Sequence, residues 1–139
     1  MDTRARDICD RVKEVVGFER IFEVAGNDFL PSYTTPKMLW FKENEPEIFE
    51  KTYKFMQSNS YIAMKLTGVM SMDYSQGYGV HFFKMDDCTV DEALAKELGL
   101  SADLKSPCSA GYVALAGWNG WRWRYASLVQ TGIWRSTFF

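Results

Sequence analysis

The sequence "TTPKMLWFKENEPE", residues 34–47, holds two prolines ten residues apart. Proline is tolerated in the first turn of a helix, because the N–H group that it lacks has no partner there. Thr35 is therefore predicted to cap a helix that begins at Pro36 and ends near Asn44. Asn44 is predicted to cap the next helix, whose first turn holds Pro46. The stretch predicts two short helices in direct succession.

Helix signals recur on both sides of this stretch. Apolar residues at helical spacing predict a helix over residues 3–16, and a loop is expected around residues 26–28. The other predicted boundaries are a stop at Gly17, a start at Ser58 or Asn59, a stop at Gly68, an N-cap at Asp73, a capping box of Thr89 with Glu92, and a stop at Gly99. Residues 1–104 are thus predicted to be mostly helical.

Length and composition indicate one ordinary globular domain. The chain has 139 residues, of which 47% are hydrophobic and 24% charged. No apolar run approaches the roughly 18 residues that cross a bilayer. Three widely spaced cysteines, an odd number, favour reduced thiols over a disulfide framework, and we expect a cytoplasmic protein.

Few residues carry chemistry that a pattern can identify. The chain holds no glycine-rich phosphate loop, no nucleophile elbow and no paired-cysteine metal site. His81 is the single histidine, and its apolar neighbours favour a structural imidazole. Asp73 is interpreted as a helix cap and not as a general base. From the residues alone, then, no catalytic site and no metal site is predicted.

Several short motifs, each weak alone, occur in a characteristic order. They are "MDTRA" at 1–5, "TTPKMLW" at 34–40, "NEPEIF" at 44–49, "YIAMKLTG" at 61–68, "MDYSQGYG" at 72–79 and "ALAKELGL" at 93–100. In this order and spacing they resemble the FGGY family of carbohydrate kinases, and most closely its xylulokinase-like branch. The resemblance extends from residue 1 to about residue 104.

The resemblance implies a fold and an activity. It implies a mostly α fragment of an α/β kinase domain of the ribonuclease-H/actin type. Residues 1–104 would be the helical part of the sugar-binding N-terminal domain, truncated at both ends. The implied reaction is phosphoryl transfer from ATP–Mg to a hydroxyl of a small ketose or polyol such as xylulose.

The resemblance also implies where the site residues lie. Ser32 and Tyr33 match a family segment whose members contact substrate, and are expected to be substrate-binding. Asp2 and Arg4 match a recurrent pair, interpreted as a cap and an ion pair near the cleft. The family's phosphate segment, its catalytic aspartate and its ATP and Mg sites would fall outside this chain. We therefore expect no catalytic, cofactor-binding or metal-binding residue here and no activity from the chain alone.

Residues 105–139 differ in composition from the rest of the chain. They contain four basic residues, no acidic residue and four of the five tryptophans. One interpretation is a short β-hairpin, because Asn119 and Gly120 suit a type I′ turn. The other is a shift of the reading frame between residues 117 and 128, which leaves the segment without selection for folding. Its few arginines do not indicate a nucleic-acid or membrane partner.

A second class of function remains open beside the kinase. The chain could be a non-catalytic helical module for interaction or regulation. In either case, short helices without a central sheet would expose apolar faces, and we expect self-association through them.

Overall fold

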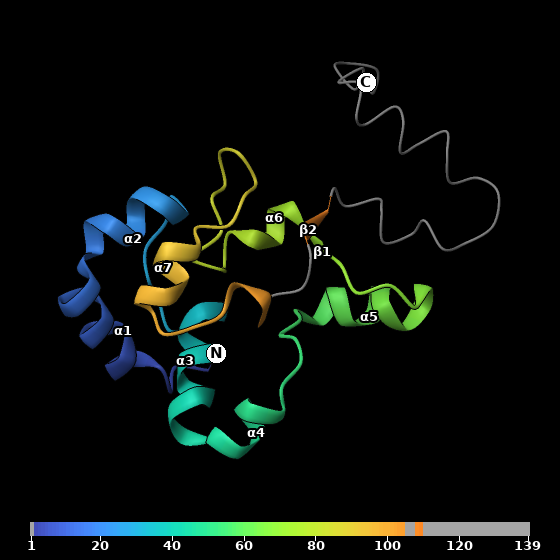
Figure 1. Ribbon diagram of the computed structural model, residues 1–139, viewed down its shortest axis with the longest axis horizontal. Coiled ribbons are helices and arrows are strands. Elements are labelled where there is room, and N and C mark those ends of the chain that lie inside the picture. Colours follow the sequence, from blue (N-terminus) through green and yellow to red (C-terminus); the bar gives the residue numbers. More distant parts are fainter. Residues whose placement is uncertain (1, 105–107, 110–139) are drawn as a thin grey trace.

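The computed structural model describes residues 2–104 and 108–109 of the chain (Figure 1). The helices are α1 (Arg6–Val12), α2 (Phe18–Ala25), α3 (Thr34–Asn44), α4 (Pro46–Lys51), α5 (Ser58–Thr67), α6 (Tyr74–Gly77) and α7 (Glu92–Glu97). A π-helical turn, η1 (Lys13–Gly17), joins α1 to α2, and η2 (Ala102–Leu104) is a 3-10 turn. The strands β1 (Met72–Asp73) and β2 (Cys108–Ser109) pair in parallel. The prediction of a mostly helical chain is confirmed for the described residues.

Helix α3 lies near the centre of the described molecule (Figure 1), contacts α1 and α4, and is hydrogen-bonded through its first turn to the segment that follows α6. Its buried residues are Thr35, Pro36, Met38 and Leu39, whose spacing places them together on one face of the helix. The motif "TTPKMLW" at residues 34–40 thus lies in the central helix of the fold.

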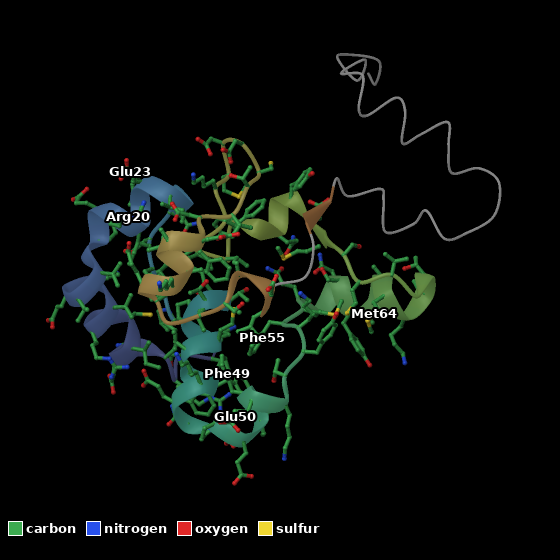
Figure 2. The ribbon with its side chains drawn as sticks, in the orientation of Figure 1. Arg20, Glu23, Phe49, Glu50, Phe55 and Met64 are labelled. Atoms are coloured by element: carbon green, nitrogen blue, oxygen red, sulfur yellow. The ribbon has the colours of Figure 1, made fainter. Side chains whose placement is uncertain are left out.

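The hydrophobic core includes Met38 and Leu39 of α3. Its largest fully buried side chains include Ile21 of α2, Phe29, Phe82, Phe83 and Leu94 of α7. A second aromatic group contains Phe49 of α4 and Phe55. These two residues lie next to each other (Figure 2), with ring centroids 6.0 Å apart. Helix α5 stands apart from α1 and α2 (Figure 1), and its side chains Ile62 and Leu66 are 57% and 75% exposed.

Several predicted helix ends are confirmed. Gly68 ends α5 with a φ of 74°, in the left-handed region that favours glycine. Asp73 caps α6, and its carboxylate accepts a hydrogen bond from the Ser75 amide at 2.8 Å. Gly17 also interrupts the first helix as predicted, but a further helix, α2, begins directly after it.

Three predicted caps are wrong, because the polar side chains bind other partners. Helix α3 begins at Thr34, and the Thr35 hydroxyl accepts a hydrogen bond from the His81 amide at 2.9 Å. The Asn44 side chain donates back to the Trp40 carbonyl at 3.0 Å and closes α3. The cap of α7 is Asp91, which accepts from Leu94 at 2.8 Å, and not Thr89.

Two sequence-based predictions concern residues beyond this description. The C-terminal β-hairpin and the shifted reading frame both fall on residues 110–139, outside the described residues. Within residues 2–104 and 108–109, no helix is long and apolar enough to cross a membrane.

Candidate functional site

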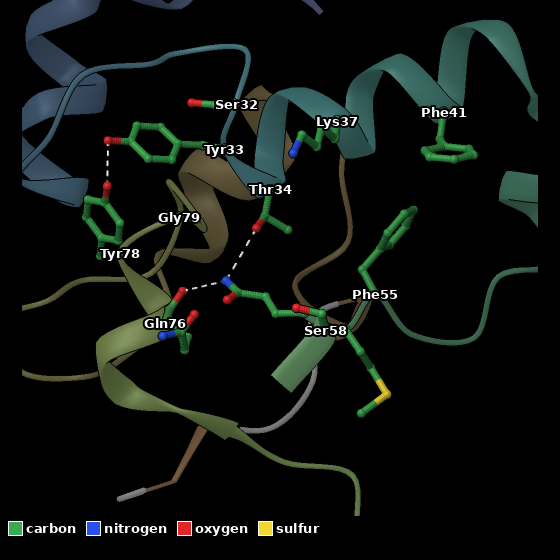
Figure 3. Close-up of a pocket in the computed structure, with 12 residues that line it drawn as sticks. Ser32, Tyr33, Thr34, Lys37, Phe41, Phe55, Ser58, Gln76, Tyr78 and Gly79 are labelled. Atoms are coloured by element: carbon green, nitrogen blue, oxygen red, sulfur yellow. Dashed lines mark hydrogen bonds between the residues drawn. The ribbon is translucent and has the colours of Figure 1, made fainter. Parts of the chain in front are cut away.

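A pocket of about 450 Å³ lies where α3, α5 and α6 meet (Figure 3). We call it the α3–α5–α6 pocket. Its polar lining comes from Ser32, Tyr33, Thr34, Lys37, Gln57, Ser58, Gln76 and Tyr78. Its apolar lining comes from Phe41, Phe55 and Met56. The volume falls within the range of about 300–1,000 Å³ that is usual for small-molecule sites.

The first turn of α3 forms one wall of the pocket, and the segment after α6 holds it in place. The amides of Thr34 and Thr35 both donate to the Gly79 carbonyl, at 3.0 and 3.2 Å. The Thr35 hydroxyl is fully buried against the His81 backbone. These contacts satisfy donors at the start of α3 and fix the position of the preceding Ser32 and Tyr33.

His81 supports this wall from the core and does not line the pocket. Its ring is fully buried, its Nε2 lies 3.0 Å from the Asp28 carbonyl oxygen, and its ring centroid is 4.5 Å from that of Phe29. Burial lowers the pKa of His81 from 6.5 to about 4, because the charged imidazolium would lose its hydration. The imidazole is therefore neutral at physiological pH, in agreement with the structural role predicted for it.

Tyr33 and Tyr78 form one side of the pocket together. The Tyr78 hydroxyl donates to the Tyr33 hydroxyl at 2.6 Å, and the ring centroids are 5.0 Å apart in an edge-to-face arrangement. This hydrogen bond raises the pKa of Tyr33 above its ordinary value. The Tyr33 phenol is therefore neutral near pH 7, and the pair offers hydrogen bonds to a ligand without a charge.

Gln57 links the three helices at the base of the pocket. Its amide Nε2 donates to the Gln76 carbonyl at 2.8 Å and lies 3.5 Å from the Thr34 hydroxyl (Figure 3). Gly79 lies close to this contact, and a Cβ at that position would come within 3.3 Å of the Thr34 hydroxyl oxygen, which is a tight approach.

Lys37 carries the only charge among the described side chains that line the pocket. It is partly buried, and among the described residues it has no ion pair within 4.0 Å. No aspartate or glutamate of the described part of the chain lines the pocket. The described lining is therefore positively charged and contains no carboxylate that could take a proton from a hydroxyl.

The Asp2–Arg4 pair lies beside the pocket. It lines a small neighbouring hollow that Lys37 lines as well. The guanidinium binds the carboxylate through two hydrogen bonds, of 3.0 and 2.8 Å, and lies 4.2 Å from the centre of the Trp40 ring. These hydrogen bonds hold the pKa of Asp2 well below its usual range, and the charge of Lys37 adds to this. The ion pair is present as expected, but Asp2 caps no helix, because α1 has Ala5 at its N-cap without a side-chain hydrogen bond.

The two residues predicted to bind substrate, Ser32 and Tyr33, both line the α3–α5–α6 pocket. Three further residues of the lining, Gln57, Gln76 and Tyr78, were not predicted from the sequence. Gln76 and Tyr78 belong to the motif "MDYSQGYG", so its place in the motif order was the available signal. Gln57 lies directly before α5 and belongs to none of these motifs. Its place in the site becomes visible only in the folded chain.

The described residues do not fit ATP–Mg. Magnesium needs several oxygen ligands, usually with carboxylates among them. Within residues 2–104 and 108–109, no group of three histidine, cysteine, aspartate or glutamate side chains could hold a metal ion. The pocket itself supplies hydroxyls, amides and one ammonium group, which suit the hydroxyls of a sugar.

Comparisons with known proteins match the sequence of this chain to a family. Residues 1–110 match the model for the N-terminal domain of the FGGY family of carbohydrate kinases. The chain is similar to xylulose kinase from Bacillus subtilis (strain 168), with 34% identity over 106 residues that cover 76% of this chain and 21% of the relative. It is also similar to xylulose kinase from Escherichia coli (strain K12), with 28% identity over 102 residues, 73% of this chain and 21% of the relative.

Solved structures share the fold of this chain. A ligand-bound xylulose kinase from Lactobacillus acidophilus gives a TM-score of 0.72 at 22% identity, over 80% of this chain and 23% of the solved one. A "xyloylose kinase" from Brucella ovis gives a TM-score of 0.72 at 23% identity, over 80% of this chain and 22% of the solved one. The chain thus spans about a fifth of the length of the curated relatives it matches.

Proposed function

Because the chain belongs to the FGGY family of carbohydrate kinases, we propose that it is part of an ATP-dependent kinase for a small ketose or polyol of the xylulose type. Residues 1–104 would supply the helical part of the sugar-binding N-terminal domain, within an α/β architecture of the ribonuclease-H/actin type. The reaction would transfer a phosphoryl group from ATP–Mg to a substrate hydroxyl. The free cysteine thiols of Cys9 and Cys88 are consistent with the proposed cytoplasmic location.

The observation that carries this proposal is the α3–α5–α6 pocket. Ser32 and Tyr33 line it beside the amides of Gln57 and Gln76, and the aromatic rings of Phe41 and Phe55 complete it. Hydroxyl and amide groups can bind sugar hydroxyls, and aromatic rings can cover the apolar face of a sugar. Ser32 and Tyr33 are proposed to contact the substrate directly.

Binding of D-xylulose to the chain tests the role of Ser32. Ser32→Ala removes one hydroxyl from the pocket, and about 1 kcal/mol of binding free energy, or about fivefold in Kd, should be lost. Isothermal titration calorimetry measures the difference, with Ser101→Ala, an exposed serine outside the pocket, as the matched control. Equal affinity of the Ser32→Ala variant and the unmodified chain would remove Ser32 from the site.

We further propose that the 139-residue chain does not catalyse phosphoryl transfer alone. The reaction needs a base for the substrate hydroxyl and ligands for Mg, and no carboxylate of the described residues lines the pocket. A coupled assay of ADP release against D-xylulose and a panel of ketoses and polyols is expected to show no sugar-dependent turnover. Sugar-dependent ADP release by the purified chain would contradict this proposal.

A non-catalytic interaction module is the second candidate. The exposed apolar side chains of α5, among them Ile62 and Leu66, favour it, because such surfaces commonly bind a partner. The same side chains would support self-association. Sugar binding at the α3–α5–α6 pocket distinguishes the two candidates, since an interaction module has no need of it.

A further inference from the structure

We propose that Gln57 is a specificity-determining residue of the α3–α5–α6 pocket, because its Oε1 atom accepts a hydrogen bond from one hydroxyl of the substrate. This inference rests on the proposed function, since it assumes that the pocket takes a sugar. It adds a third contact to those of Ser32 and Tyr33, the two residues proposed above to contact the substrate.

The side-chain amide of Gln57 has a fixed orientation. Its Nε2 donates to the Gln76 carbonyl at 2.8 Å and lies 3.5 Å from the Thr34 hydroxyl (Figure 3). The opposite orientation of the amide would place Oε1 against the Gln76 carbonyl oxygen, where neither oxygen has a proton to share. The nitrogen of the amide therefore binds the walls of the pocket, and the oxygen points elsewhere.

The Oε1 atom of Gln57 is an acceptor without a donor in the described part of the chain. No hydrogen bond to it occurs within residues 2–104 and 108–109, and it is not one of the fully buried polar atoms that lack a partner there. Since Gln57 lines the pocket, a ligand in the pocket can reach this oxygen. A sugar hydroxyl that leaves water needs such an acceptor for its proton.

Few side-chain atoms of the described lining can only accept a hydrogen bond. The hydroxyls of the lining both donate and accept, and its ammonium group only donates. The two acceptor-only oxygens in this part of the chain are the side-chain carbonyls of Gln57 and Gln76. The Gln76 side chain has no hydrogen bond among the described residues, so only Gln57 holds its oxygen in place before a ligand arrives. An acceptor that is already ordered loses less entropy on binding.

A purely structural bridge would not need this oxygen. Gln57 lies directly before α5 in an extended conformation, and its side chain does not cap that helix. Serine, threonine, aspartate and asparagine are the residues usually preferred for that purpose. A bridge to α6 uses the amide nitrogen and leaves the oxygen unused, whereas a bound sugar would use both ends of the amide.

Isothermal titration calorimetry on the full 139-residue chain tests the inference through paired changes in protein and ligand. The ligands are D-xylulose and each of its monodeoxy derivatives, which lack one hydroxyl at a time. At least one derivative should bind the unmodified chain about five- to tenfold more weakly than D-xylulose, because Oε1 is then left without a donor. Gln57→Met should bind D-xylulose and that derivative with equal affinity.

Gln76→Met is the matched control in the same pocket, and it should keep the discrimination that Gln57→Met loses. A structural role of Gln57 would instead weaken the binding of all ligands by one common factor. Circular dichroism verifies that each variant folds. The NMR signals of the Gln57 side-chain amide give a readout that needs no variant. They should shift more with saturating D-xylulose than with saturating amounts of the discriminated derivative.

The outcomes separate this inference from the proposed function. Discrimination that survives in Gln57→Met, or a common loss of affinity for all ligands, overturns the role of Gln57 and leaves the sugar pocket standing. Equal binding of D-xylulose and every derivative by the unmodified chain also overturns that role. No binding of D-xylulose or its derivatives by the folded chain overturns both proposals.

Discussion

Replacing Gly77 by alanine perturbs the packing beneath the pocket at a position where the structure leaves no space. An ideal Cβ on Gly77 would lie 2.3 Å from Cδ1 and 2.4 Å from Cε1 of the Phe83 ring. Carbon atoms in contact are normally about 3.5–4.0 Å apart, so the overlap exceeds about 1 Å. Gly77 lies at the end of α6, which carries Gln76 into the pocket.

The Phe83 ring cannot easily move away. The residue is 1% exposed, its amide donates to the Val80 carbonyl at 2.8 Å, and its ring stacks on Tyr74 with centroids 6.4 Å apart. Overpacking of this kind costs about 1–3 kcal/mol. The melting temperature of Gly77→Ala should therefore fall by roughly 3–10 °C, as measured by thermal unfolding followed by circular dichroism.

A double-mutant cycle with Phe83→Ala isolates the cause. Phe83→Ala alone should cost about 3–5 kcal/mol, because it leaves a cavity in the core. The methyl group that Gly77→Ala adds would enter that cavity, so the double variant should be no less stable than Phe83→Ala alone. Equal destabilisation by Gly77→Ala in both backgrounds would refute the steric explanation.

Three further predictions address the core, a helix cap and the exposed surface. The pKa of His81 in the folded chain lies below its ordinary value, so protonation of His81 destabilises the fold. The free energy of unfolding should fall by up to about 3 kcal/mol as the pH drops from 6.5 toward 4. Urea unfolding between pH 7 and 5 should show this loss, and the His81→Leu variant should lack it. Asp91→Ala should lower the free energy of unfolding by about 1–2 kcal/mol in the same assay, because Asp91 caps α7. Thr89→Ala should lower it by less. A larger loss for Thr89→Ala than for Asp91→Ala would indicate that Thr89 is the cap, as the sequence predicted. Leu66→Lys should shift sedimentation toward the monomer without loss of helix content, and unchanged association would exclude this part of α5 from the contact.

Local signals in the sequence predicted the helix ends where the deciding interaction is local. The cap at Asp73 binds an amide two residues away, and the stop at Gly68 depends on a left-handed conformation of that residue alone. The Thr35 hydroxyl instead binds His81, which is 46 residues further along the chain. No local pattern contains that contact, so the predicted cap was wrong although a helix does begin at the preceding residue.

The same difference between local signals and long-range contacts applies to the candidate site. The motif order identified the segment with Ser32 and Tyr33, and both residues line the pocket. The pocket exists because Gln57 bridges α6 and the first turn of α3, and because Gly79 accepts two hydrogen bonds from that turn. Such contacts join segments 19 or more residues apart, and their chemistry is visible only once the chain has folded.

We propose that the α3–α5–α6 pocket takes a small sugar, and an NMR titration of the labelled chain with D-xylulose measures binding at individual residues of the pocket. The amide signals of Thr34, Gln57, Gln76 and Gly79 should shift together with one saturating affinity, while the signal of Ile21 in α2 should stay in place. A folded chain whose pocket signals do not move at saturating D-xylulose, or whose shifts gather away from this pocket, would contradict the claim.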